Sequence, residues 1–168
     1  MRMKGFTLIE IITVMLVVGI LFAAGIVTYS TVWRNHQTDT AETELRDISG
    51  GISNYLIDYG NIILPNDTNF ETALNETIDT LNKQYLNYEI EKNEIATDKK
   101  SVKLVTRHKT DPWKNKYNLY IYTYNGDDKT SIPGLVIISS NGVDGVSSKA
   151  TYKDGNYGDD IAAVVEPK

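Results

Sequence analysis

The fold is decided by residues 1–33, which read MRMKGFTLIEIITVMLVVGILFAAGIVTYSTVW. Arg2 and Lys4 precede a long apolar run, and the next basic residue is Arg34. As a helix, residues 6–32 would extend roughly 40 Å at about 1.5 Å per residue, which is long enough to cross a bilayer. Because basic residues favour the cytoplasmic side, we expect a single-pass membrane segment with a cytoplasmic N-terminus and an exported C-terminal part.

Glu10 is the only charged residue between Lys4 and Arg34. A carboxylate in an apolar membrane segment costs about 2.5–3.5 kcal/mol on insertion scales, so it needs a partner or a purpose. Two ordinary interpretations give it neither. One is a secretory signal peptide cut near residues 23–25, where Ala-Ala-Gly offers small side chains, and the other is a plain single-pass anchor. Glu10 therefore counts against both.

The sequence GFTLIE at residues 5–10 resembles the processing site of type IV prepilins and of the pseudopilins of type II secretion. The resemblance covers the basic leader, the cleavage point and the start of the apolar helix. It implies cleavage after Gly5 by a membrane prepilin peptidase and N-methylation of the new terminal residue, Phe6. It also implies an assembly platform protein and a helical filament made of copies of this chain and related pilins. The precursor is expected in the cytoplasmic membrane, and the filament, a pilus or fimbrium, at the cell surface.

The same resemblance gives Glu10 a function. Cleavage would create an ammonium group on Phe6 in apolar surroundings, where the Glu10 carboxylate of a neighbouring subunit would neutralise it. We expect this pairing to set the stagger between subunits. One departure from the family is Val27, which lies where many members have a proline. Gly19 and Gly25 are then positions where the helix could stretch or, equally, where helices could pack closely.

The resemblance implies an α+β fold, the type IV pilin fold, in which a long N-terminal helix packs on a small antiparallel sheet. We divide the chain into a leader (residues 1–5), a transmembrane and assembly helix (6–33) and a soluble head (34–168). Residues 34–59 are expected to continue the first helix, because apolar residues recur there at spacings of three and four. These residues are Ala41, Leu45, Ile48, Ile52, Tyr55, Leu56 and Tyr59.

The rest of the head is expected to contain one short helix and a sheet. Gly50-Gly51 is expected to interrupt the first helix, and Gly60 and Pro65 to end it. A second helix over residues 70–85 would follow a cap at residues 66–68. Aromatic and β-branched residues followed by turn residues predict strands, of which the first two pair antiparallel and the third adds to them. These strands are residues 117–124, 135–139 and 101–106.

Composition limits the partners of the head. The formal net charge of −5 argues against a general nucleic-acid binder, and no specific nucleic-acid partner is predicted. A local basic stretch at residues 99–109 is interpreted as a solvated strand and loop, with contact to DNA or to an acidic partner as the alternative. The chain has no cysteine, which does not by itself report the compartment.

The C-terminal third carries a second resemblance. DPWKNKY at residues 111–117, SSNGVDG at 139–145 and GDDI at 158–161 follow the order found in the major pseudopilin of type II secretion. In that family the loop after the last long strand binds calcium, which takes six to eight oxygen ligands. The resemblance implies Asp144, Asp159 and Asp160 as calcium ligands, together with carbonyl oxygens near Ile138 or Asn141. Residues 146–157 make this loop longer than the family's, which affects the alignment of ligands.

Three functions follow from these patterns. The first is a structural subunit of a type IV pilus, and the second is a pseudopilin of a type II secretion or DNA-uptake (competence) system. The third is a single-pass, membrane-anchored binding module, which would keep residues 1–5. An enzyme is not expected, because His36 and His108 lie in polar stretches with no nucleophile or metal ligand at a telling spacing.

Overall fold

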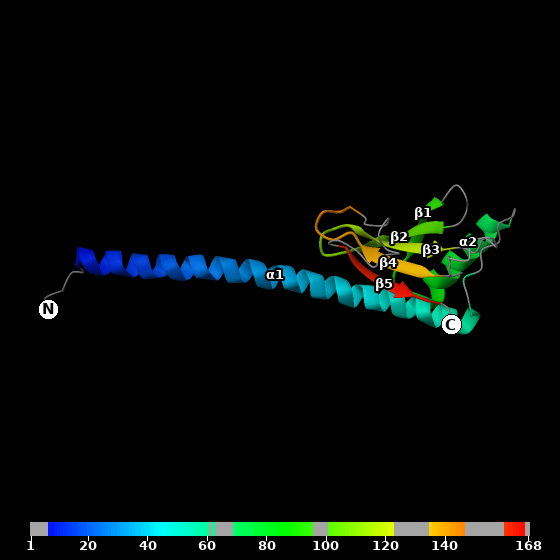
Figure 1. The fold of residues 1–168 in the computed structure, drawn as a ribbon, viewed down its shortest axis with the longest axis horizontal. Coiled ribbons are helices and arrows are strands. Elements are labelled where there is room, and N and C mark those ends of the chain that lie inside the picture. The colour runs from blue at the N-terminus through cyan, green and yellow to red at the C-terminus, as the bar shows by residue number, and fades with distance from the viewer. Residues whose placement is uncertain are drawn as a thin grey trace. The chain divides into compact units, whose positions relative to one another are not determined.

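The structure is a computed structural model that describes residues 7–60, 62, 69–95, 101–122, 135–146 and 160–166, with the backbone alone at Val27. The chain divides into two compact units, Met1–Gln37 and Thr38–Lys168, which are described separately. The elements, all but η1 labelled in Figure 1, are α1 (Leu8–Tyr59), α2 (Phe70–Thr80), a π-helix η1 (Leu81–Tyr85), β1 (Ile90–Ile95), β2 (Ser101–Thr110), β3 (Lys116–Tyr122), β4 (Val136–Ser140) and β5 (Ile161–Val165). A long N-terminal helix and a small antiparallel sheet form the expected α+β arrangement, consistent with a pilin fold.

In the first unit, α1 presents its apolar side chains to the outside. An 18-residue window of this helix has a mean hydropathy of 2.7 and none of it is buried, so it is long and apolar enough to cross a membrane. α1 runs without a break through Gly19 and Gly25, and a Cβ atom at either position would meet nothing within 4 Å. Exposed apolar surface on this scale is unfavourable in water and must be covered by lipid or protein.

In the second unit, the helical stripe predicted from sequence forms one side of the hydrophobic core, except for Tyr59, which is 56 % exposed. Ala41, Leu45, Ile48 and Ile52 are at most 2 % exposed. The facing side chains come from alternate positions on three strands, as expected for one face of a pleated sheet. They are Val102 and Leu104 of β2, Leu119 and Ile121 of β3, and Val136 and Ile138 of β4. α2 and η1 add Phe70, Leu74 and Leu81 to the same core.

The sheet has five antiparallel strands in sequence order, β1-β2-β3-β4-β5. The predicted antiparallel pairing of the two central strands is confirmed, with Leu119 opposite Ile138. The predicted third strand is also present and is longer than expected. Residues 123 and 124 of the predicted first strand lie outside the described residues. The two edge strands, β1 and β5, were not predicted.

The expectation that Gly50-Gly51 interrupts the first helix is wrong, because α1 continues to Tyr59. Gly51 instead permits close contact between α1 and the end of η1. A Cβ atom at Gly51 would lie 2.8 Å from Leu86 Cδ2 and closer still to the carbonyl oxygen of Tyr85, whereas one at Gly50 would meet nothing within 4 Å. Gly51 is therefore required for packing, and Gly50 is not.

The second helix is confirmed over Phe70–Thr80, and η1 extends it by one π-helical turn, closed by a bond of 2.9 Å from Leu86 N to the carbonyl of Leu81. The N-cap is Asn69, which makes no side-chain capping bond. The predicted cap at residues 66–68 lies outside the described residues. Asn82 fixes the next element, because its side-chain amide exchanges bonds of 2.8 and 3.0 Å with the backbone of Ile90, where β1 begins.

A polar contact ties α1 to the sheet. The Glu44 carboxylate accepts hydrogen bonds from the Lys109 ammonium and the Tyr117 hydroxyl. Burial, and then the bond to Glu44, raise the pKa of Tyr117, so it stays a neutral donor. The basic stretch of the sequence is thus partly neutralised within the head, because Arg107 also pairs with Glu89 at 2.8 Å and Glu91 at 3.1 Å. This pairing supports the interpretation as a solvated strand.

Candidate functional site: the N-terminal end of the apolar helix

The first turn of α1 is closed by a reciprocal pair of hydrogen bonds between Thr7 and Glu10. The Thr7 backbone N–H and hydroxyl each donate to Glu10 Oε2 at 2.8 Å. In return, the Glu10 backbone N–H approaches the Thr7 hydroxyl oxygen at 3.4 Å and the Thr7 carbonyl at 3.1 Å. This is a capping box, in which a Thr before the helix and a Glu three residues later satisfy each other's backbone groups.

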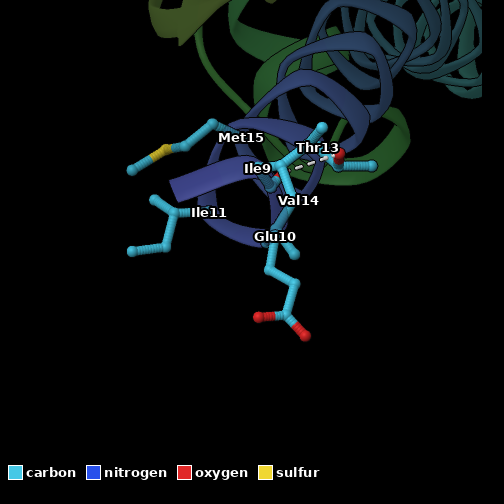
Figure 2. Close-up of a pocket in the computed structure, with 6 residues that line it drawn as sticks. All are labelled: Ile9, Glu10, Ile11, Thr13, Val14 and Met15. Carbon is cyan, nitrogen blue, oxygen red and sulfur yellow. Dashed lines mark hydrogen bonds between the residues drawn. The ribbon is translucent and has the colours of Figure 1, made fainter. Parts of the chain in front are cut away.

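The helical turn that carries Glu10 is otherwise lined mainly by apolar side chains. Figure 2 shows the carboxylate pointing away from the helix, with Ile9, Ile11, Val14 and Met15 around the same turn. Thr13 has the only hydroxyl among the residues labelled in Figure 2, and this hydroxyl donates to the Ile9 carbonyl at 2.8 Å. Because the lining residues belong to one short stretch of helix, the hollow they form is open and would be closed by a neighbouring helix or by lipid.

The two carboxylate oxygens of Glu10 differ in their hydrogen bonding. Both side-chain bonds within the described part of the chain end on Oε2, and both come from Thr7. No donor from the described residues reaches Oε1. The capping box thus orients the carboxylate through Oε2, while Oε1 can accept a hydrogen bond from another molecule.

Gly5 and Phe6 lie outside the described residues. Of the three predicted N-terminal site residues, the structure therefore describes only Glu10, which lies in the first turn of α1. Sequence reasoning overlooked Thr7. The signal was present, since Thr-Leu-Ile-Glu before an apolar run has the spacing of a capping box.

Of the predicted calcium ligands, Asp144 lies in the turn at residues 141–146. Asp144 is exposed, and its Oδ1 accepts the backbone N–H of Val146 at 2.7 Å. Asp160 is 7 % exposed and precedes β5, while Asp159 lies outside the described residues. Among the described residues, no group of three or more His, Cys, Asp or Glu side chains is placed to hold a metal ion.

The structure gives a clear role to Asp111, which sequence reasoning used only as part of a motif. Asp111 is 3 % exposed and lies in the connection between β2 and β3. Its Oδ1 accepts the backbone N–H groups of Trp113 at 3.0 Å and Asn115 at 2.7 Å, and its Oδ2 accepts the Ser140 hydroxyl at 2.6 Å. One buried carboxylate therefore holds the β2–β3 connection against the end of β4.

Asparagine side chains extend this network to the 141–146 turn. Asn115 Nδ2 donates to the Gly142 carbonyl at 3.0 Å, and Asn118 Nδ2 donates to Asn141 Oδ1 at 2.6 Å. Asn141 Nδ2 closes the turn on the Gly145 carbonyl at 3.1 Å. The motifs at residues 111–117 and 139–145 are thus brought together by the antiparallel pairing of β3 and β4.

Comparison with known proteins identifies a motif at the N-terminus of the chain. Residues 1–26 match the family model described as the prokaryotic N-terminal methylation motif. Neither the curated proteins nor the solved structures contain a match to the chain. The matched residues include the basic leader, Gly5, Phe6 and the capping box of α1. The N-terminal part of this chain therefore carries the type IV prepilin signature, which is shared by pilins and pseudopilins.

Proposed function

We propose that this chain is a structural subunit of a type IV pilus or pilus-like filament. In this proposal, prepilin peptidase cleaves after Gly5, the new terminus at Phe6 is N-methylated, and the mature subunit polymerises through α1. The observation that carries the proposal is the methylation motif at the start of a helix whose large apolar side chains are exposed in the described part of the first unit. The role is structural and assigns no catalysis to the chain.

The capping box supports a specific assembly contact. After cleavage, the Phe6 ammonium of one subunit would meet the Glu10 carboxylate of its neighbour. Thr7 occupies Oε2 and leaves Oε1 for the ammonium, so the pairing adds a bond without breaking the cap. In apolar surroundings a paired carboxylate and ammonium are far more stable than the two separated charges, and removing one partner costs about 3–5 kcal/mol. The contact would therefore favour a single register between neighbouring helices.

Replacing Glu10 by alanine tests this contact in cells that assemble the filament. The removed interaction corresponds to an affinity loss of roughly 100-fold or more between subunits, so sheared filaments should fall by a comparable factor. Cleavage after Gly5 should be unchanged. Glu42→Ala is the matched control, because Glu42 is an exposed carboxylate of the same helix whose closest basic group, on Arg46, is 3.8 Å away. Normal filament yield from Glu10→Ala would remove the pairing from the proposal.

A pseudopilin of a secretion or DNA-uptake system is the second candidate. It is favoured by the contact between the motifs at residues 111–117 and 139–145, whose order resembles the major pseudopilin head. Electron microscopy of the cell surface separates the two. Long fibres labelled by an antibody to the head support a pilus, whereas loss of secretion or transformation on gene deletion, without long fibres, supports a pseudopilin.

We also propose calcium as a stabiliser of the C-terminal loop. The carboxylates of Asp144, Asp159 and Asp160 and the carbonyl oxygens of the turn are the ligand types that calcium prefers. The support is this donor chemistry and the resemblance of the loop. Thermal melting with calcium, with magnesium and with a chelator is the test. Calcium should raise the melting midpoint above that in chelator, and identical midpoints would remove the ion from the proposal.

A further inference from the structure

The outer end of the apolar segment carries an aromatic pair. Tyr29 and Trp33 are one turn apart on α1, and their rings stack with centroids 6.3 Å apart and planes 18° from parallel. His36 continues the same stripe, with its ring edge-on to Trp33 at 6.4 Å. Tyr29 is 69 % exposed and Trp33 is 53 % exposed, so these rings are not part of a core within the first unit.

Tyrosine and tryptophan rings of this kind have an apolar body and a polar group at one end. They are enriched where the hydrocarbon of a membrane meets the lipid headgroups, because both parts of the ring are then satisfied. The sequence changes character at this pair. Apolar residues dominate before Tyr29, whereas Trp33 is followed at once by Arg34, the first basic residue after Lys4.

The spacing along the helix matches one membrane. From Glu10 to Tyr29 the helix rises about 29 Å at about 1.5 Å per residue, and Trp33 lies about 6 Å further on. The hydrocarbon layer of a bilayer is about 30 Å thick. When the Glu10 carboxylate lies at the inner boundary of the hydrocarbon, the Tyr29–Trp33 pair therefore lies at the outer one.

We infer that Tyr29 and Trp33 form an interfacial anchor that binds the headgroup region of the outer leaflet and sets the depth of the unassembled subunit. The anchor keeps Glu10 at the opposite boundary, where its carboxylate is less costly than in the hydrocarbon. The inference rests on membrane insertion and not on polymerisation. It can therefore fail while the filament proposal stands, and the filament proposal can fail while the anchor stands.

Tryptophan quenching in lipid vesicles tests this depth. Trp33 and Trp113 are the only tryptophans, so Trp113→Phe leaves Trp33 as the single reporter in the full chain. The protein is placed at low density in vesicles whose lipids carry bromine either near the headgroup end or near the end of the acyl chain. We expect the shallow bromines to quench Trp33 at least about twofold more strongly than the deep ones, because the ring lies at the interface.

A second variant calibrates the measurement. Phe22→Trp, combined with Trp33→Phe and Trp113→Phe, moves the reporter about 16 Å along the helix, towards the middle of the bilayer. The deep bromines should quench this reporter most strongly. If Trp33 is instead quenched most by the deep bromines, or only by iodide in the water, the pair does not lie at the interface and the inference is wrong.

Discussion

Asp111 offers the sharpest test of how the head is held together. Replacing Asp111 by alanine removes the acceptor of three hydrogen bonds, from the backbone of Trp113 and Asn115 and from the Ser140 hydroxyl. The site is buried, so water does not readily replace the carboxylate. Hydrogen bonds to charged groups contribute about 1.5–3 kcal/mol each, and buried donors left without a partner cost about 1–3 kcal/mol. Because these losses overlap, we expect the free energy of unfolding to fall by about 3–5 kcal/mol.

Asp111→Asn separates the two oxygens of the carboxylate. The amide oxygen can keep the two backbone N–H bonds at the Oδ1 position. The amide nitrogen would then face Ser140, whose hydroxyl can turn to accept instead of donate. The charge is lost but few groups are left unpaired, so the free energy of unfolding should fall by only about 1–2 kcal/mol.

Urea unfolding of the full chain in a non-ionic detergent, followed by near-ultraviolet circular dichroism, measures these changes. Asp79→Ala is the control, because Asp79 forms an exposed pair with Lys83 and its loss should change the free energy of unfolding by less than about 1 kcal/mol. The expected order of stability is wild type, then Asp111→Asn, then Asp111→Ala. A change below about 0.5 kcal/mol for Asp111→Ala, or equal effects of both substitutions, would refute the reasoning.

Three further predictions concern other parts of the chain. Gly51→Ala should destabilise the head by about 1–3 kcal/mol, because the added Cβ would overlap the backbone of η1. Gly50→Ala should instead stabilise α1 by about 0.5–1 kcal/mol, because its Cβ would meet nothing within 4 Å. Equal effects of the two substitutions in the same urea-unfolding assay would contradict this prediction. Hydrogen bonds from lysine and arginine side chains hold the pKa of Glu91 below its ordinary 4.5. The ionised carboxylate therefore stabilises the head above pH 4.5, and this stabilisation is lost as the pH falls through the lowered pKa. The melting temperature of Glu91→Gln should fall less on acidification than that of wild type, and identical melting profiles in acid would show that Glu91 does not stabilise the head in this way. Thr7→Val removes the capping hydroxyl and should reduce filament yield about 5- to 30-fold, with normal cleavage after Gly5. Thr7→Ser keeps the hydroxyl and should retain wild-type yield. Equal yields from the two variants would show that the cap does not matter for assembly.

The sequence alone predicts those helices and strands in which the spacing of the apolar residues matches the side that is buried in the structure. The stripe from Ala41 to Leu56 has helical spacing and faces the core. The central strands β3 and β4 are rich in aromatic and β-branched residues and are buried along almost their whole length. In both cases a single pattern determines the element, because tertiary packing favours the same state as local propensity.

The edge strands were missed for a physical reason. β1 reads IEKNEI and has only Ile90 buried, so its composition resembles that of a solvated helix or loop. Charged residues are common on edge strands because they discourage pairing with other chains. β5 is five residues long, and only Val165 is buried. The strand character of both comes from hydrogen bonding to a neighbour, which a one-dimensional pattern does not contain.

The candidate site was predicted in part. The motif identified Glu10 and its apolar setting, but not the bonds from Thr7 that fix the carboxylate. The Asp111 network and the close contact at Gly51 depend on residues far apart in the sequence, such as Asp111 and Ser140, which are separated by 29 in residue number. Only the folded head brings these residues together, so their roles could not be read from local patterns.

Intact-mass spectrometry of the membrane-extracted protein shows whether this chain is processed as a prepilin. We expect a mature chain that begins at Phe6 and carries one additional methyl group on its terminal nitrogen. A matched sample from cells lacking prepilin peptidase should retain residues 1–5. A chain from wild-type cells that still begins at Met1, with or without a formyl group, would show that the protein is not a processed prepilin.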